Sequence, residues 1–425
     1  MAGLKILICG AGIAGNALAF WLAKQGHHSI TIIERFPNLR ATGLQVDLRS
    51  PGIDVLRRMG LEKAFREVTV PEQGLQLVDS RNRRWGYFPA NRSGKGLQSF
   101  TTDFEIMRGD LCHLLYGAVK DRVEYLFGVY VVEMQQMDGG FVDVVLSDGR
   151  RDRFDVVVGA DGLGSRSRSM MMMMRGDGDD ARDPVHSIGV AAGYFTIDRK
   201  LEKGEKYDAT AYITTQGRGI MVRRHDPNKI QAYMFCKAGP FENCAKGDVE
   251  REKQVMGQVF RDAGWKCEEI VKGMEEADDF YCERMGVVNL DSWSRGRVVL
   301  VGDAAYCPSA MTGMGTSCAM VGAYILAGEI GKHCAKGVGP KVDIAMAFKD
   351  YEDKLRPFIV NVQKGLMDDH DYMSRLPSST LGITLVYLLF AVASFLRLDV
   401  LSQWLLREDC NKDWKLPEYP SMVDN

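Results

Sequence analysis

The stretch KILICGAGIAGNALAFWLAKQGHHSITIIER, residues 5–35, decides the fold of this 425-residue chain. An apolar run at 6–9, typical of a buried parallel strand, leads through a glycine-rich turn into a helical segment, and a second apolar strand follows at 30–33. Strand, helix and strand in this order form a complete βαβ unit, which indicates an α/β protein with a parallel sheet.

Three glycines and an acid give this unit the spacing of a dinucleotide site. In Gly10-x-Gly12-x-x-Gly15, the first glycine permits the tight turn, the second lets a pyrophosphate approach the backbone, and the third lets helix pack on strand. The helix N-terminus offers free N–H groups to phosphate, and Glu34 is placed to accept a hydrogen bond from a ribose hydroxyl. The alternative is a glycine-rich turn without a ligand, and the framing strands, helix and acid argue against it.

Composition narrows the class of protein. The length predicts two or three domains, and a net charge of -2 with a pI near 6.4 gives no reason to expect nucleic acid as a partner. The ten cysteines contain no CxxC pair and the seven histidines no HExxH motif, so we expect a reduced, metal-free protein. The N-terminal apolar run leads directly into the glycine turn, so we expect no cleavable signal peptide and a cytoplasmic location.

Two further strand ends carry acids. The segment VVVGADGLGSRSR at 156–168 ends a buried strand in Asp161 and Gly162, at the sheet edge where nucleotides bind in open α/β folds. The segment RVVLVGDAAYCPSAMTGMGTSCAMVGAYILAGEI at 297–330 ends a strand in Asp303 and continues through a glycine-containing loop, whose backbone could face an electron-rich ring edge, into an apolar helix. The alternatives are a strand-end turn before a solvated basic helix, and a plain core helix.

The segments between these motifs alternate between helical and strand patterns. Helices are predicted at 53–61, 106–119 and 249–263, and β-hairpin material at 74–100. Short runs rich in Val, Ile, Thr and Tyr at 187–238 predict a further sheet that could cover a bound planar molecule. The five methionines at 170–174 predict an adaptable, mobile surface segment.

The three strand-end motifs, in this order, resemble the class A flavoprotein monooxygenases of the aromatic-hydroxylase fold. The resemblance covers about residues 4 to 365 and is closest to the tetracycline-inactivating flavin monooxygenases and related polyketide-tailoring enzymes. It is carried further by GDAAYCPS, VGAYILAGE, DDFY at 278–281 and SWSRGR at 292–297. One departure is SAMTGMG at 309–315, where many relatives have a proline-rich turn and Gly-Gln-Gly.

The resemblance implies an α/β (α+β two-domain) architecture. A Rossmann-like FAD-binding domain would carry an inserted β-sheet substrate domain and be followed by C-terminal helices. The expected parts are an FAD-binding domain at 1–75, 100–180 and 280–365, a substrate domain at 76–99 and 181–279, and a helical tail at 366–425.

The resemblance also implies roles for single residues on the dinucleotide side. Glu34 and Arg35 would lie at the adenosine ribose of FAD, and Arg108, in RGDL, would contact the dinucleotide. Asp161 would support the pyrophosphate region and transient NADPH docking, and Asp303 would hold the ribityl chain.

On the flavin side, the resemblance implies that Asp47, in GLQVDLR, lies near the ring, and that Gly315 and Thr316 face the pyrimidine edge. Met221 and Arg223, in the strand 221–224, would line the substrate pocket. No catalytic acid–base pair is nominated, because in this chemistry the cofactor carries the reaction.

The resemblance implies that NADPH or NADH reduces bound FAD, which then reacts with dioxygen to a flavin C4a-hydroperoxide. One oxygen atom is then transferred to an aromatic or polycyclic, polyketide-like small molecule. Tetracycline-like compounds are among the candidate substrates. An FAD-dependent oxidase or reductase and a flavin protein that sequesters a hydrophobic ligand are the alternatives. A halogenase is disfavoured because the chain has no WxWxIP signature. Hydroxylation, Baeyer–Villiger insertion and epoxidation stay open, as do biosynthesis and antibiotic inactivation as the biological role.

The C-terminal run LGITLVYLLFAVASFL at 381–396 is strongly apolar but shorter than the roughly twenty residues that span a bilayer. We expect a helix docked on the FAD domain or between the domains, with membrane association as the alternative. Arg397, Asp399 and Arg407 follow at once, which favours docking. The chain is expected to be a monomer.

Overall fold

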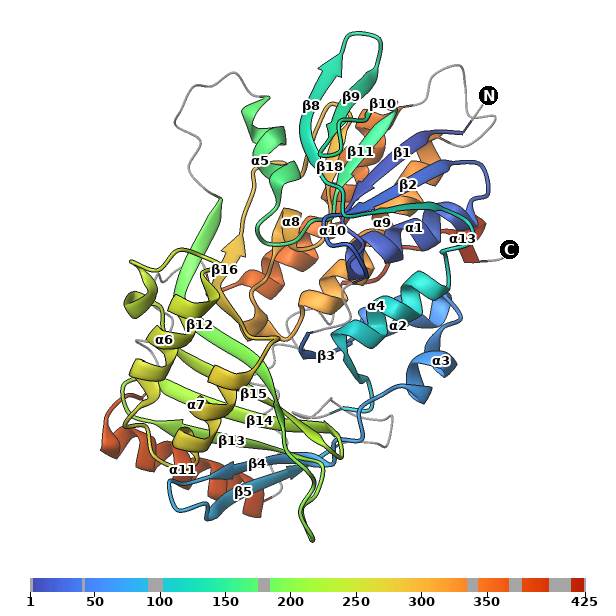
Figure 1. Cartoon of the computed structure of the whole chain (residues 1–425). Helices are drawn as coiled ribbons and strands as arrows, with labels where there is room; N and C mark the ends of the chain where they lie inside the picture. The colour runs from blue at the N-terminus through green and yellow to red at the C-terminus, as the bar shows by residue number, and fades with distance from the viewer. Residues whose placement is uncertain are drawn as a thin grey trace.

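Two large sheets and the helices around them make up the molecule (Figure 1). The computed structural model describes residues 3–39, 43–90, 102–174, 184–334, 343–366, 377–396 and 414–423. All nine cysteines in these ranges are buried and free of disulfide bonds.

The first sheet is the parallel sheet that the sequence predicts. Its order is β17-β18-β11-β1-β2-β7, with only β17 antiparallel to its neighbour. The strands are β1 (Lys5–Cys9), β2 (Ser29–Glu34), β7 (Glu124–Phe127), β11 (Val156–Gly159), β17 (Ser294–Arg295) and β18 (Val298–Leu300). The central strands are apolar on both faces because helices and a small sheet cover them.

Helices and two small sheets surround this parallel sheet. The helices are α1 (Ile13–Lys24), α2 (Gly52–Arg58), α3 (Glu62–Glu67), α4 (Arg108–Gly117), α5 (Arg166–Met173), α8 (Asp303–Tyr306), η2 (Ala310–Thr312), α9 (Gly315–Cys334) and α10 (Ile344–Gln363). The small sheets pair β3 (Gln45–Asp47) with β6 (Glu105–Met107), and β8 (Val131–Met137) with β9 (Phe141–Leu146) and β10 (Arg151–Phe154). Helix α9 is buried on nearly all sides, between α1 and α10.

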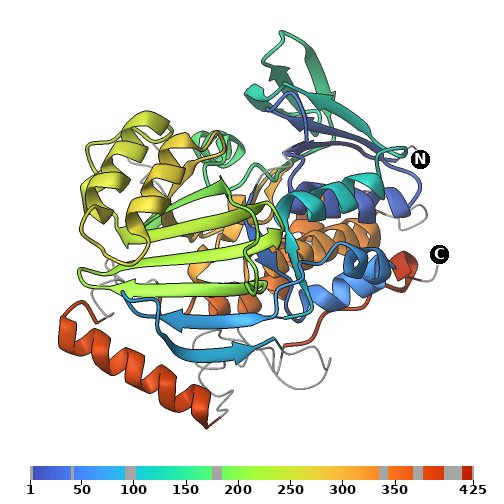
Figure 2. The ribbon, with the colours of Figure 1, turned by 60° about the horizontal axis from the view of Figure 1, so that its bottom comes forward.

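The second large sheet has the order β16-β12-β15-β14-β13-β4-β5. Its strands are β4 (Gly74–Val78), β5 (Arg84–Pro89), β12 (Val185–Asp198), β13 (Asp208–Thr214), β14 (Arg218–Asp226), β15 (Lys229–Lys237) and β16 (Tyr281–Val288). Figure 2 shows α6 (Val249–Phe260) and α7 (Cys267–Glu276), which follow the turn η1 (Gly239–Phe241), on one face of this sheet, and α11 (Thr380–Phe395) along the other face. The short α13 (Pro420–Val423) ends the described chain.

The structure confirms the mixed α/β fold and corrects details. Ile106 and Met107 belong to β6, so the helix predicted at 106–119 begins at Arg108. The reason is tertiary, because β6 pairs with β3 from a distant part of the chain. The methionine run lies mostly in α5, with Met171 buried and Met173 exposed, and its mobility stays a prediction.

Helix α11 packs on the second sheet and not on the part of the molecule around the parallel sheet, which corrects the expected docking place. Ile383 and Tyr387 contact Leu77, Trp85 and neighbouring residues of the sheet. Among the described residues, no helix has both the length and the apolar character needed to cross a bilayer. Arg397, Asp399 and Arg407 lie outside the described residues.

The packing of α9 predicts a strong effect of one glycine. A Cβ at Gly322 would lie 1.8 Å from the Tyr306 hydroxyl, so Gly322→Ala should destabilise the protein by about 2 kcal/mol or more through overpacking. Thermal unfolding of the purified protein measures the loss. The matched control is Gly117→Ala at the end of α4, where a Cβ meets no atom within 4 Å. Equal melting temperatures for both variants would contradict the prediction.

Candidate functional site

The turn between β1 and α1 is closed by backbone contacts that only glycine allows. Gly10 has φ +115°, and a Cβ there would lie 2.6 Å from the carbonyl oxygen of Ala160 on the neighbouring strand end. A Cβ at Gly15 would lie 1.9 Å from the carbonyl oxygen of Gly10. The close approach of helix and strand therefore depends on the missing side chains.

Gly12 has a different role, because the space beside it is open. A Cβ there would meet only Nη2 of Arg108, at 3.8 Å. Glu34 braces the same turn, since its Oε2 accepts a hydrogen bond from the Ala11 N–H at 3.0 Å. The turn thus presents backbone N–H groups at the start of α1 to an anion.

Arg108 and Asp303 reach this turn from distant segments. The stem of Arg108 lies against Gly43, where a Cβ would be 3.3 Å away, and its guanidinium ends beside Gly12. Asp303 begins α8 directly after Gly302, which has φ +67°. Burial raises the pKa of Asp303, and the Arg108 guanidinium opposes that shift. The structure therefore brings together Gly12, Arg108 and Asp303, three residues that sequence analysis singled out.

Asp161 lies at the same sheet edge, but its carboxylate is engaged locally. It accepts hydrogen bonds from the hydroxyl of Ser165, and from the N–H and hydroxyl of Ser167 at 3.0 and 3.1 Å. These bonds hold the start of α5, as in the strand-end turn weighed as the alternative. Its predicted role at the pyrophosphate stays a prediction, and so does the role of Arg35, whose exposed guanidinium lies over the ring of Phe36.

The loop before α9 is strained and its first helical turn is open. Ser309 has φ +66°, and its buried hydroxyl has no hydrogen-bond partner among the described residues. A Cβ at Gly315 would meet no atom within 4 Å, so the N-terminus of α9 at Gly315 and Thr316 is accessible to a ligand. Strained backbone of this kind is typical of ligand sites.

Arg49 connects this loop to β3, and sequence analysis did not single it out. Its side chain is fully buried, and its Nη2 lies 2.5 Å from Oδ2 of Asp47. Its backbone N–H donates to the Ser317 hydroxyl at 2.8 Å, and a Cβ at Gly313 would lie 3.7 Å from its Nε. Asp47 is therefore held beside the first turn of α9.

A buried charge cluster joins β3 and β6 to the second sheet. The Arg223 guanidinium donates to Glu72 at 2.6 and 2.8 Å and to Glu105 at 2.6 Å. Gln45 donates to both acids. Burial raises the pKa of Glu105 well above its ordinary value, with Arg223 opposing and Asp47 adding to the shift. With Arg49 and Asp47, the cluster holds three carboxyl groups and two guanidinium groups.

An apolar sheet face lies beside this cluster. Met221 shares it with Tyr194, Tyr233 and Phe235, and Leu44, which directly precedes β3, packs against it. The Tyr233 hydroxyl accepts a hydrogen bond from the Gln45 N–H at 3.1 Å. Met221 lies on this apolar face, and its role in lining a substrate pocket stays a prediction, as does that of Arg223, whose guanidinium is bound to Glu72 and Glu105.

Comparison with known proteins agrees with a dinucleotide site at the turn after β1. A family model described as FAD binding domain matches residues 3–341. The chain is 43% identical to the FAD-dependent monooxygenase asL4 of Sarocladium schorii over 100% of both chains. It is 40% identical to the flavin-dependent monooxygenase eupH of a Phoma species over 90% of each. The solved structure of tetracycline destructase Tet(51) matches with a TM-score of 0.75 at 29% identity, over 99% of this chain and 100% of that one.

This chain belongs to the family of FAD-dependent monooxygenases. The membership confirms the resemblance that the strand-end motifs carry. The residues of this monooxygenase fit FAD on structural grounds, because the backbone at Gly12 and Gly315 is open, the guanidinium of Arg108 faces the phosphate-binding turn, and the Ser309 hydroxyl is buried without a partner in the described chain.

Several functional candidates in the monooxygenase escaped sequence analysis. Glu72 and Glu105 stand in segments that show no motif by themselves, whereas Arg49 ends GLQVDLR and Ser309 begins SAMTGMG, two segments that drew attention for other reasons. The one local signal is the three-residue segment Asp47-Leu48-Arg49, where an arginine follows the expected flavin-side acid. The partners of Glu72 and Glu105 come from distant parts of the chain, so no spacing rule could find them, and the unpartnered hydroxyl of Ser309 is visible only in the structure.

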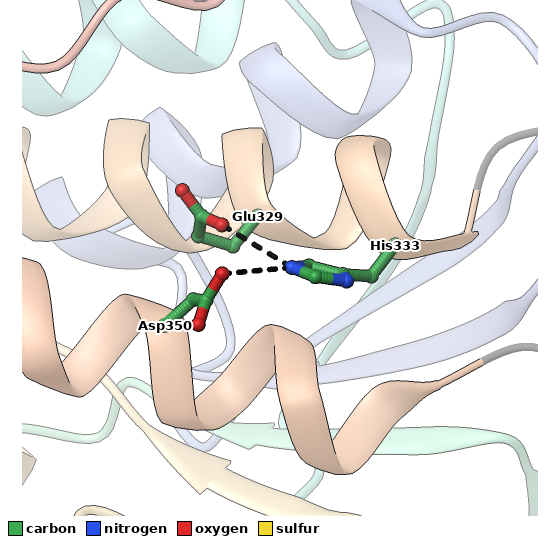
Figure 3. A group of neighbouring side chains, drawn as sticks. All are labelled: Glu329, His333 and Asp350. Carbon is green, nitrogen blue, oxygen red and sulfur yellow. Dashed lines mark hydrogen bonds and ion pairs between the residues drawn. The ribbon is translucent and has the colours of Figure 1, made fainter.

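Far from the dinucleotide turn, three side chains lie close enough for a metal ion (Figure 3). They are Glu329 and His333 of α9 and Asp350 of α10. His333 Nε2 lies 2.9 Å from Asp350 and 3.6 Å from Glu329. Lys332 and Lys354 already form ion pairs with these carboxylates, so we interpret the group as an ion-pair network that joins the two helices.

The position of Arg108 predicts a loss of cofactor. Arg108→Ala should weaken FAD binding about tenfold or more, because it removes the cation beside the phosphate-binding turn and leaves Asp303 uncompensated. The ratio of flavin to protein absorbance after gel filtration measures occupancy. Arg153→Ala, at an exposed arginine of β10, is the matched control. Full yellow colour in the Arg108 variant would overturn the assignment.

The cluster around Arg223 predicts opposite effects for its two glutamates. Because the pKa of Glu105 is raised in the folded protein, Glu105 lowers the stability of the wild type as the pH rises above the pKa of about 4.3 that a glutamate has in the unfolded chain. The stability of Glu105→Gln relative to the wild type should therefore increase from about pH 5 to about pH 8. Glu72→Gln should instead destabilise by about 3 kcal/mol, because it weakens the pairing of buried Arg223. Melting temperatures across this pH range test both. A uniform loss in Glu105→Gln would mean that Glu105 is ionised.

Proposed function

We propose that this FAD-dependent monooxygenase uses NADPH or NADH and dioxygen to insert one oxygen atom into an aromatic or polycyclic, polyketide-like small molecule. The observation that carries the proposal is the placement of an apolar, aromatic sheet face, with Met221 and Tyr233, next to the strand of Asp47 and the open first turn of α9. Likeness to a tetracycline destructase at 29% identity supports a fused-ring substrate.

We assign each of these residues to the part of FAD that its position would face. Gly12, Arg108 and Asp303 would hold the pyrophosphate and ribityl parts of FAD, with Glu34 bracing the turn. Gly315 and Thr316, with the positive end of α9, would face the flavin pyrimidine edge. When bound, FAD supplies electron transfer and oxygen activation.

The protein's own contribution to the reaction is orientation and exclusion of water. Arg223 ties β14 to Glu105 of β6 and so fixes the second sheet relative to the FAD-binding side. The apolar face around Met221 and Tyr194 would hold a flat ring and keep water away from the flavin. We propose that residues 76–99 and 181–279, which supply most strands of this sheet, form the substrate domain, and that residues 1–75, 100–180 and 280–365, which supply β16, form the FAD-binding domain.

The test is NADPH and NADH oxidation by the purified yellow protein, with and without a panel of fused-ring phenols that includes tetracyclines, and with product masses recorded. Oxidation that a substrate stimulates, together with a product heavier by one oxygen atom, is the expected result. Bound flavin that neither nicotinamide reduces under any condition would replace the proposal by an oxidase or a ligand-sequestering role.

A further inference from the structure

Asn16 is the one amide side chain in the buried part of helix α1. All other residues of 13–23 are apolar or glycine, and Asn16 itself is 0% exposed. Asparagine is unfavourable inside a helix, and a buried amide group costs free energy unless its hydrogen-bonding atoms are paired. An asparagine in this position therefore needs partners, and the structure supplies them at both ends of its amide group.

The amide nitrogen of Asn16 binds the glycine turn between β1 and α1. Its Nδ2 donates to the carbonyl oxygen of Ala11 at 2.6 Å and to that of Gly12 at 3.0 Å. In a planar trans peptide the C=O and N–H groups point in opposite directions. Because both carbonyl groups point toward Asn16, the N–H groups of Gly12 and Ile13 point away from it, out of the start of α1, where a phosphate group would bind.

The amide oxygen of Asn16 accepts a hydrogen bond from a residue that is distant in the chain. The hydroxyl of Tyr125, on the edge strand β7, donates to Oδ1 of Asn16 at 2.6 Å. An amide donates only from its nitrogen and accepts only at its oxygen, so this bond determines which end of the amide faces the glycine turn. Burial raises the pKa of Tyr125, and Tyr116 adds to the shift, so the hydroxyl keeps its proton at neutral pH.

Aromatic contacts and the strand register hold Tyr125 in place. Its ring stacks with that of Phe127 at a centroid distance of 5.9 Å, and the ring of Tyr116 on α4 meets it edge-on at 4.8 Å. Strand β7 pairs in parallel with β2, where Tyr125 lies opposite Ile32. The Tyr125 hydroxyl is therefore positioned before any ligand binds.

Ala11 is thus held at both of its backbone polar groups. Its N–H donates to Glu34 at 3.0 Å, and its C=O accepts from Asn16. A segment tied in this way cannot rotate its peptide planes without breaking one of the two bonds. An anion site made of backbone N–H groups binds more tightly when their direction is set in advance, because less conformational freedom is lost on binding.

We propose that Asn16 and Tyr125 are positioning residues of the cofactor site: the Tyr125 hydroxyl orients the Asn16 amide, and the amide holds the glycine turn with its N–H groups directed at the diphosphate of FAD. Asn16 is fully buried, so it acts on the cofactor only through the backbone. The inference rests on the part of the proposed function that places the diphosphate at Gly12 and Arg108. It does not depend on the reaction.

The experiment measures the FAD dissociation constant of the full-length holoenzyme by serial dilution and ultrafiltration. We expect Tyr125→Phe to weaken FAD binding about fivefold and Asn16→Ala about tenfold. Because the two residues act through one chain of hydrogen bonds, the double variant should bind FAD no more weakly than Asn16→Ala alone. Tyr116→Phe is the matched control, since it removes a hydroxyl from the neighbouring ring and keeps the bond between Tyr125 and Asn16.

Phosphorus NMR of the same holoenzymes separates positioning from a purely structural role. The resonances of the bound FAD diphosphate should shift in Tyr125→Phe, because the N–H groups that face the phosphate oxygens change direction. The visible absorption of the flavin ring should stay as in the wild type, since the ring lies away from this turn in the proposed placement. Tyr116→Phe should change neither spectrum.

Three outcomes would overturn the positioning roles. The first is wild-type FAD affinity in both single variants, and the second is a double variant whose loss equals the product of the two single losses. The third is a lower melting temperature of Tyr125→Phe with unchanged diphosphate resonances, which would assign the bonds to the stability of the fold alone. Wild-type affinity in these variants together with loss of flavin in Arg108→Ala would leave the placement of the diphosphate standing.

Discussion

The contact of Gly15 with the carbonyl of Gly10 is the constraint on which the cofactor side of the monooxygenase depends. At this point helix α1 lies so close to β1 that any side chain would separate them. Because the two elements meet there, the N–H groups at the start of α1 face the sheet edge, and the Ala11 N–H is oriented by Glu34. Arg108 and Asp303 can act on a bound phosphate group only because that sheet edge lies beside them.

A second constraint is the burial of charge between the two sheets. Arg223, Glu72 and Glu105 come from three separate segments and are nearly inaccessible to water. Removing such groups from water is costly unless each finds a partner, so the cluster is satisfied only when β14 lies in one position against β6. We infer that its main effect is to specify the separation of the two sheets, more than to add stability.

The two faces of the second sheet pack against different parts of the molecule. Alternate residues such as Tyr212 and Met234 pack under α6 and α7, while Tyr233 and Met221 face the FAD-binding side. Helix α11 takes the remaining end of the latter face. The sheet is therefore wide enough to face the FAD-binding side and still to carry an apolar helix at its margin.

The sequence by itself determined the βαβ unit, the roles of Gly10 and Gly15 in its turn, and the strand-end position of Asp303, because these features depend on spacing within short segments. Only the tertiary structure decided that Asp161 holds the start of α5, that Ile106 is a strand residue, and that α11 packs on the second sheet. Arg49 and Glu105 became visible as site residues only there. Their environments are made by residues distant in the chain, and burial and charge pairing across such distances leave no periodic trace in a sequence.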